Sequence, residues 1–326
     1  MNKKYLEFRT DMADERVDMY KKVNNLSKVD GIKVTSFSNE NVIVTEVEVL
    51  NENGENVIKK QKGKYITIQI QDFDIIDENE KENIQKNISE EIKKVIKDIN
   101  ANSFMIVGLG NDNVTPDALG PGVVKYIDIT RHLIKYASNL VKEGTKEISA
   151  ISPGVLGTTG IETYEIIRSV VDSVKPDALI VIDSLASGSI HRIGNTVQIS
   201  NTGITPGEGV KNKRESLDKE SLGIPVIAIG VPTVVDMATI TNEAIDKLVE
   251  DIKNEIKNYS NTDCLNDTSN KECIDIFKIF ENDTRYDMIA NALNTNNYIV
   301  TPKEVDELIL KMSEIIANSI NISLSK

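Results

Sequence analysis

The sequence predicts an α/β domain with a doubly wound, mostly parallel sheet. Four short runs rich in apolar residues, FMIVGL, EISAIS, ALIVID and IPVIAIG, occur between residues 103 and about 260. Continuous apolar runs are typical of strands that are covered on both faces. Because helical stretches separate these runs, they predict β-α-β units and parallel pairing.

Two stretches between the runs show helical spacing of apolar residues. They are DALGPGVVKYIDITRHLIKYA, which begins at residue 117, and GIETYEIIRSVVDSV, which begins at residue 160. Apolar residues that recur every three or four positions predict helices that pack against the sheet. We therefore expect residues 103 to about 260 to form the α/β core.

The segments on either side of this core predict further elements. Residues 41–50 and 65–71 alternate apolar and polar side chains around an Asn53-Gly54 turn signal, which predicts paired antiparallel strands. Apolar residues from Ile84 to Ile99 recur at helical spacing and predict a helix. A C-terminal helix that starts at a Thr-Pro pair is predicted by the stretch TPKEVDELILKMSEIIANSI. We interpret the asparagine-rich stretch near 260 to 272 as an exposed loop.

Composition narrows the classes of function. The chain has 326 residues, with 38 basic and 51 acidic side chains and a net charge of −13, which argues against direct nucleic-acid binding and against an anionic membrane surface. The longest apolar stretch, 224–235, is too short to span a bilayer. Without an apolar signal-peptide core, a cytoplasmic location is expected. Cys264 and Cys273 lie in a polar stretch and are interpreted as reduced cysteines.

Glycines follow the first strand of the core, in the stretch VGLGNDNVTPDALGP from residue 107 to 121. Such glycines suggest a phosphate loop, but Asn113 stands where a third glycine is needed and no Walker lysine follows. Thr115 and Pro116 instead predict a helix start with Asp117 in its first turn. An anionic ligand would be repelled by Asp117. The alternative role for Asp117 is a carboxylate that complements the helix dipole.

A second aspartate ends the strand ALIVID, at Asp183. In open α/β sheets the carboxyl ends of the strands form the crevice where ligands bind. Asp117 follows the carboxyl end of its own strand, so we expect both carboxylates to face one cleft. The alternative for Asp183 is a helix cap or a structural hydrogen bond.

Five motifs resemble the germination protease family of spore-forming bacteria. They are GLGNDNVTPDALGP, PGVLGTTGIETYEII, ALIVIDSLAS, VQISNTGITPGEGVKNKR and LGIPVIAIGVPTVVD, between residues 103 and 240. The resemblance implies an atypical aspartic endopeptidase that is made as a zymogen and degrades small acid-soluble spore proteins when germination starts. It implies a core like that of hydrogenase maturation proteases and catalytic roles for Asp117 and Asp183. It also implies a homotetramer in the forespore and spore core, with no organic cofactor and no required metal.

The same resemblance gives an interpretation of the N-terminus. The family's substrates are cut within Glu-(Phe or Ile)-Ala-Ser-Glu, and Asp11-Met12-Ala13-Asp14-Glu15 follows a similar pattern. We therefore expect self-processing between Asp11 and Met12, which leaves residues 1–11 as a propeptide and 12–326 as a single peptidase domain. The alternative is a frayed acidic N-terminus.

Two neighbouring carboxylates have the chemistry that peptide hydrolysis needs. One accepts the proton of water while the other, still protonated, polarises the carbonyl group. Such a pair titrates as a unit, so the sequence alone assigns neither role to Asp117 or to Asp183.

Other enzyme classes fit the sequence less well. The two histidines, His132 and His191, are 59 residues apart and outside any zinc-protease motif. Ser152 and Ser184 lack the G-x-S-x-G elbow of serine hydrolases. Two alternatives remain: a hydrogenase-maturation-type endopeptidase whose carboxylates bind nickel, and a module that binds spore proteins without cutting them.

Overall fold

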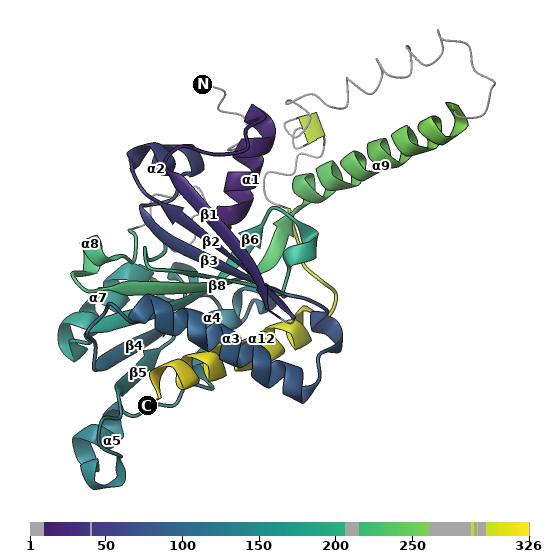
Figure 1. The fold of residues 1–326 in the computed structure, drawn as a ribbon. Helices are drawn as coiled ribbons and strands as arrows, with labels where there is room; N and C mark the ends of the chain where they lie inside the picture. Colours follow the sequence, from purple (N-terminus) through teal and green to yellow (C-terminus); the bar gives the residue numbers. More distant parts are fainter. Residues whose placement is uncertain are drawn as a thin grey trace.

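A computed structural model describes residues 10–39, 41–205, 215–260, 288, 289, 292 and 298–325. The predicted polar loop beyond residue 260, with both cysteines, lies outside these residues. One sheet runs through the described part of the chain in the order β1-β2-β3-β7-β8-β6-β4-β5, with β9 (Ile299–Val300) added beside β8. Figure 1 shows this sheet with helices on both sides.

The four predicted core strands form the parallel part of the sheet. They are β4 (Ser103–Gly108), β5 (Glu147–Ile151), β6 (Ala178–Ser187) and β8 (Val226–Asp236). β4 lies between β5 and β6, and β6 pairs in turn with β8, all in parallel. The predicted α/β fold with parallel central strands is therefore confirmed.

The rest of the sheet is antiparallel. β7 (Thr196–Ser200) connects β8 to β3 (Gly63–Ile70), which pairs with β2 (Val42–Val49) and then with the edge strand β1 (Ile32–Asn39). The predicted pairing of the two N-terminal strands is confirmed. β1 and β7 were not predicted from the sequence.

The turn expected at Asn53-Gly54 is wrong, because helix α2 (Glu52–Ile58) connects β2 to β3. The side chain of Asn51 accepts a hydrogen bond from Gly54 N at 3.1 Å and caps this helix. The polar cluster therefore starts a helix instead of turning a hairpin, since asparagine serves equally well in both roles.

Helices α3 (Glu78–Ile96), α4 (Leu119–Val124) and α12 (Val305–Leu324) cover one face of the sheet. Figure 1 shows α3 and α12 side by side on this face. The helix predicted from its isoleucine spacing is α3, and Ile84, Ile88 and Ile92 are fully buried against the sheet. Burying each isoleucine side chain stabilises the fold by about 1.5–3 kcal/mol.

The opposite face is covered by α7 (Thr163–Val174) and, over the antiparallel strands, by α1 (Ala13–Asn24) and α2. Alternate residues of each central strand supply the two faces: Ile180 and Ile182 contact one layer, whereas Leu179 and Val181 contact the other. The sheet is therefore doubly wound, as predicted. The remaining described helices include α6 (Leu156–Thr159), α8 (Lys219–Leu222) and α9 (Met237–Ser260).

The long helix expected from residue 117 is interrupted. It forms the 3-10 turn η3 (Thr115–Asp117), then α4, then α5 (Arg131–Tyr136). Thr130 breaks it, because its N–H and hydroxyl join the edge of β5: Thr130 N donates to Ile148 O at 3.1 Å and Thr130 Oγ1 accepts from Ile148 N at 2.8 Å.

The C-terminal helix begins at Val305 and not at the Thr301-Pro302 pair. The hydroxyl of Thr301 instead donates to the carbonyl oxygen of Thr233 at 2.9 Å, which attaches this segment to β8. Among the described helices, none combines the length and the apolar character that crossing a bilayer requires.

Candidate active site

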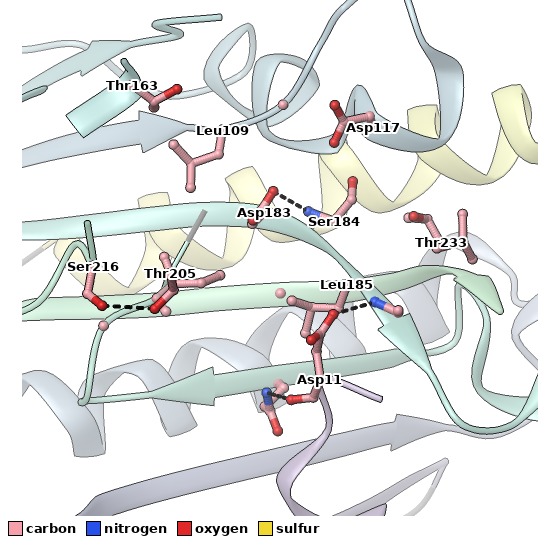
Figure 2. Close-up of a pocket in the computed structure, with 18 of the residues that line it drawn as sticks. Asp11, Leu109, Asp117, Thr163, Asp183, Ser184, Leu185, Thr205, Ser216 and Thr233 are labelled. Carbon is pink, nitrogen blue, oxygen red and sulfur yellow. Dashed lines mark hydrogen bonds between the residues drawn. The ribbon is translucent and has the colours of Figure 1, made fainter. Parts of the chain in front are cut away.

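A pocket of about 570 Å³ opens where β4 has ended and β6 and β8 continue. Its wall includes Asp117 from the loop after β4, Asp183 from β6 and Asp11 from the N-terminal segment. Figure 2 shows Asp117 and Asp183 entering this pocket from facing segments. The structure therefore brings the two predicted aspartates together at one edge of the sheet.

Asp183 lies within β6, not at its end, because β6 continues four residues to Ser187. β4 ends at Gly108, and the N–H of the next residue, Leu109, donates to Ile182 O at 2.8 Å. Beyond that point Asp183 has no parallel neighbour on the β4 side, which leaves room for the pocket. One of its carboxylate oxygens accepts a hydrogen bond from Ser184 N at 2.9 Å.

The loop that carries Asp117 folds back on the end of β4. Asn111 N donates to the carbonyl oxygen of Asp117 at 3.0 Å. Gly110 has a φ of +111°, and a Cβ atom there would lie 2.0 Å from that same oxygen. Only glycine fits this approach without displacing the loop.

A second close approach explains the remaining glycines of this motif. A Cβ atom on Gly108 would lie 2.2 Å from the carbonyl oxygen of Gly120, at the start of α4. The glycines therefore let two backbone segments meet, and they do not form the phosphate loop that was first considered. Thr115 also differs from its predicted role: Val114 is the cap residue of η3, and no side chain caps that turn.

Thr233 on β8 fixes the Asp117 loop to the sheet. Its hydroxyl donates to Pro116 O at 2.7 Å, one residue before Asp117, and its side chain is fully buried. No sequence pattern predicts this role of Thr233, because a threonine within an apolar strand is also a common structural residue. The motif LGIPVIAIGVPTVVD contains it but does not distinguish it from its neighbours.

Both aspartates hold their protons more tightly than exposed carboxyl groups do. Burial raises the pKa of Asp117 to about 6, against a backbone hydrogen bond from Asn111 that lowers it. Burial, followed by the charge of Asp117, raises the pKa of Asp183 well above its usual range. The charge of Asp117 thus acts on Asp183, and both carboxyl groups favour their protonated form more than exposed carboxyl groups do.

A hydroxyl group next to the pair has an unused capacity for hydrogen bonding. Ser184 Oγ is buried and has no hydrogen-bond partner among the described residues. Leaving a buried hydroxyl without a partner costs free energy, which a bound substrate would recover. No histidine lines this pocket, so a hydrogen-bonding role fits Ser184 better than the role of a serine-hydrolase nucleophile.

The N-terminal segment forms another part of the pocket wall. Asp11 N donates to Ala186 O at 2.9 Å, and the Asp11 carboxylate accepts from Ala186 N at 2.8 Å (Figure 2). The next side chain, Met12, is fully buried. The carbonyl oxygen of Asp11 accepts from Gln198 Nε2 at 3.2 Å. This segment is therefore bound to β6 and β7 and is not the frayed end that was the alternative.

The other candidates from the sequence lie outside the pocket. His132, His191 and Ser152 are exposed, and none of them lines the pocket. Asp112, on the same loop as Asp117, pairs with Lys125 on the surface at 3.1 Å. The described residues contain no group of three or more histidine, cysteine or acidic side chains with metal-binding geometry.

Comparison with known proteins gives a consistent set of relatives. Residues 7–263 match the profile of a family described as germination protease. A germination protease of Clostridium tetani is 42% identical over 324 residues, which cover 98% of this chain and 96% of that protein. A germination protease of Bacillus mycoides is 37% identical over 342 aligned positions, which cover 97% of this chain and 93% of that protein.

The solved structure of a [NiFe] hydrogenase maturation protease of Thermococcus kodakarensis can be superposed on 44% of this chain, and the superposed part covers 80% of that protease. The overlap has a TM-score of 0.31 and 23% sequence identity. That likeness is too weak to bear on activity.

Proposed function

Because the chain belongs to the germination protease family, we propose that it hydrolyses peptide bonds with Asp117 and Asp183 as an acid and base pair. The chain is an endopeptidase of spore germination; the aspartic mechanism is our proposal. The observation that carries it is that the carboxyl groups of Asp117 and Asp183 line one pocket, where burial and then the charge of Asp117 raise the pKa of Asp183.

The proposed reaction uses one water molecule and the single proton that the pair retains. Asp117, with the lower pKa, accepts a proton from water while the water oxygen bonds to the peptide carbonyl carbon. Asp183 donates its proton to the carbonyl oxygen, which gives a tetrahedral intermediate. The proton on Asp117 then passes to the leaving nitrogen as the C–N bond breaks. Asp183 recovers its proton from the intermediate, which leaves a carboxylic acid and an amine.

The proposed substrates are small acid-soluble spore proteins, cut when germination starts. We also propose that the chain acts in the forespore and spore core as a homotetramer, which sedimentation of the purified protein would test. The chain's own segment Asp11–Glu15 follows the pattern of the family's substrates and is bound beside the pair, which supports a peptide as ligand.

A cleavage assay tests the proposed function. A chain that starts at Met12 is incubated with a small acid-soluble spore protein, with and without EDTA, and the products are sequenced. We expect cleavage after a glutamate, at an equal rate in both samples. Loss of cleavage in EDTA would favour the nickel-binding alternative, and tight binding without cleavage would favour a binding module.

Processing of the chain itself gives a second prediction. The full-length protein, incubated alone, should lose its first eleven residues and yield a product that starts at Met12 by mass spectrometry. The Asp183→Asn variant should stay intact under the same conditions, because it lacks the proposed acid that protonates the peptide carbonyl oxygen. A product that starts far downstream of Met12 would refute the assigned cleavage bond.

The pH dependence of cleavage follows from the two raised pKa values. The active form carries one proton on the pair, so kcat/KM should fall below about pH 6, as Asp117 becomes protonated. It should also fall at high pH, once Asp183 loses its proton. Initial rates between pH 4 and 10 measure both limbs. A rate that does not change between pH 5 and 7 would contradict the proposed role of Asp117.

A further inference from the structure

A single hydroxyl group connects the predicted cleavage site to a buried carboxylate. Thr10 Oγ1 accepts a hydrogen bond from Met12 N at 3.0 Å and donates to Glu15 Oε2 in a very short contact. Thr10, Met12 and Glu15 are all buried. One oxygen atom, Thr10 Oγ1, therefore lies between the Met12 nitrogen and the Glu15 carboxylate. Thr10 precedes the predicted cleavage bond, whereas Met12 and Glu15 follow it.

Glu15 is held in place by the end of β6. Its Oε1 accepts from Ser187 Oγ and its Oε2 accepts from Gly188 N, both at 2.7 Å. Arg192 also forms an ion pair with this carboxylate, with Nε 3.5 Å from Oε1, although the closer partner of that arginine is Asp14. Burial raises the pKa of Glu15, against hydrogen bonds from Thr10 and Gly188 and the charge of Arg192, which lower it. Glu15 therefore shares its arginine with a second carboxylate.

Met12 and Ala13 are fixed independently of the residues before them. Both side chains are fully buried, and Ala13 N donates to Gln198 Oε1 at 2.7 Å. Helix α1 starts at Ala13, and Val17 anchors its first turns in the core. Loss of residues 1–11 would leave this attachment in place.

We propose that Glu15 is a binding site for the α-ammonium group that hydrolysis of the Asp11–Met12 bond creates. The inference rests on the self-processing proposed above. Hydrolysis adds one water molecule, which gives Asp11 a new carboxylate and turns the Met12 amide nitrogen into an ammonium group with three N–H donors. Release of residues 1–11 removes Thr10, so a donor leaves Glu15 at the moment when a stronger, charged donor appears beside it.

The charges around this site favour the ion pair over a free ammonium group. A positive charge at a helix N-terminus is disfavoured by the helix dipole, so it needs a compensating anion. Asp14 already pairs with Arg192, and Arg16 donates to backbone carbonyl oxygens of Thr10 and Ile58. Arg192 is thus shared by Asp14 and Glu15. Of these two carboxylates, Glu15 is the one that Thr10 Oγ1 connects to Met12 N.

The test compares two forms of the chain that starts at Met12, one with a free α-amine and one with an acetylated α-amine. At pH 7 we expect the free form to melt about 2–4 °C higher, because acetylation removes the charge. The pKa of the Met12 amine, measured by the pH dependence of its chemical labelling, should lie above its ordinary value of about 8. An ammonium group whose pKa is raised in the folded chain stabilises the fold below about pH 8. This contribution is lost as the pH rises through the pKa that the amine has in the folded chain.

The same comparison in the Glu15→Gln background tests the partner. The difference between the free and acetylated forms should disappear there, whereas it should persist with Asp18→Asn, an exposed acid one turn further along α1. An equal difference in the Glu15→Gln background would overturn the proposal. If that variant does not fold, the labelling experiment decides: an amine pKa at or below about 8 in the unsubstituted chain overturns it.

These measurements do not depend on proteolysis. A chain that shows the ion pair but cuts no spore protein would refute the proposed function alone. A chain that cuts normally but shows no coupling between the amine and Glu15 would refute this inference alone.

Discussion

Replacing Asp183 by asparagine should slow cleavage of a small acid-soluble spore protein by about 10³-fold or more, and replacing Asp117 should do the same. Asparagine has nearly the shape of aspartate, but it can neither accept the proton of water nor donate a carboxyl proton. Initial rates with the chain that starts at Met12 measure the loss. Circular dichroism and the melting temperature check that each variant is folded.

Asp112→Asn is the matched control for these variants. Asp112 lies on the same loop as Asp117 but is exposed and pairs with Lys125 on the surface. Exposed ion pairs contribute about 0–1 kcal/mol, so this variant should keep its stability and its activity. A folded Asp117→Asn protein that cuts as fast as the Asp112→Asn protein would remove Asp117 from the mechanism.

The second large effect is expected at Gly110. An alanine there would need the disfavoured φ of +111° and would place its Cβ atom 2.0 Å from the carbonyl oxygen of Asp117. The loop must then move, and a displacement of about 1 Å of a reacting group can cost about 100-fold in rate. We expect Gly110→Ala to lower kcat by about that factor.

Gly160→Ala separates this effect from a general effect of adding a methyl group at a positive φ. Gly160 has a φ of +73°, a Cβ atom there meets nothing within 4 Å, and the residue does not line the pocket, so this variant should keep most of its activity. The carboxyl pKa of Asp117, measured by NMR, should change in Gly110→Ala and not in Gly160→Ala. Normal kinetics for Gly110→Ala would show that the position of the Asp117 loop does not limit the reaction.

Most of the central part of the fold could be predicted because β4, β6 and β8 are buried on both faces. Their runs are apolar at nearly every position, which few other structures require. The meeting of Asp117 and Asp183 followed from the same argument, since parallel strands bring their carboxyl ends to one edge of the sheet. These predictions depend on patterns that lie within short segments.

Other features could not be predicted because they depend on contacts between distant segments. β7 is short, and it pairs antiparallel with both β3 and β8, at the point where the antiparallel strands meet the parallel ones. The hydrogen bond from Thr233 to Pro116 joins residues 117 positions apart. The hydrogen bonds that Glu15 accepts from Ser187 and Gly188 likewise join segments that no local pattern connects.

Comparison of the two single variants with the double variant Asp117→Asn/Asp183→Asn tests the central claim most directly. If the two carboxyl groups act as a unit on one water molecule, the double variant should cleave no more slowly than either single variant, because each substitution alone removes the whole function. If each residue contributes separately, the two losses multiply. Multiplying losses, or a single variant with normal activity, would contradict a shared acid and base pair.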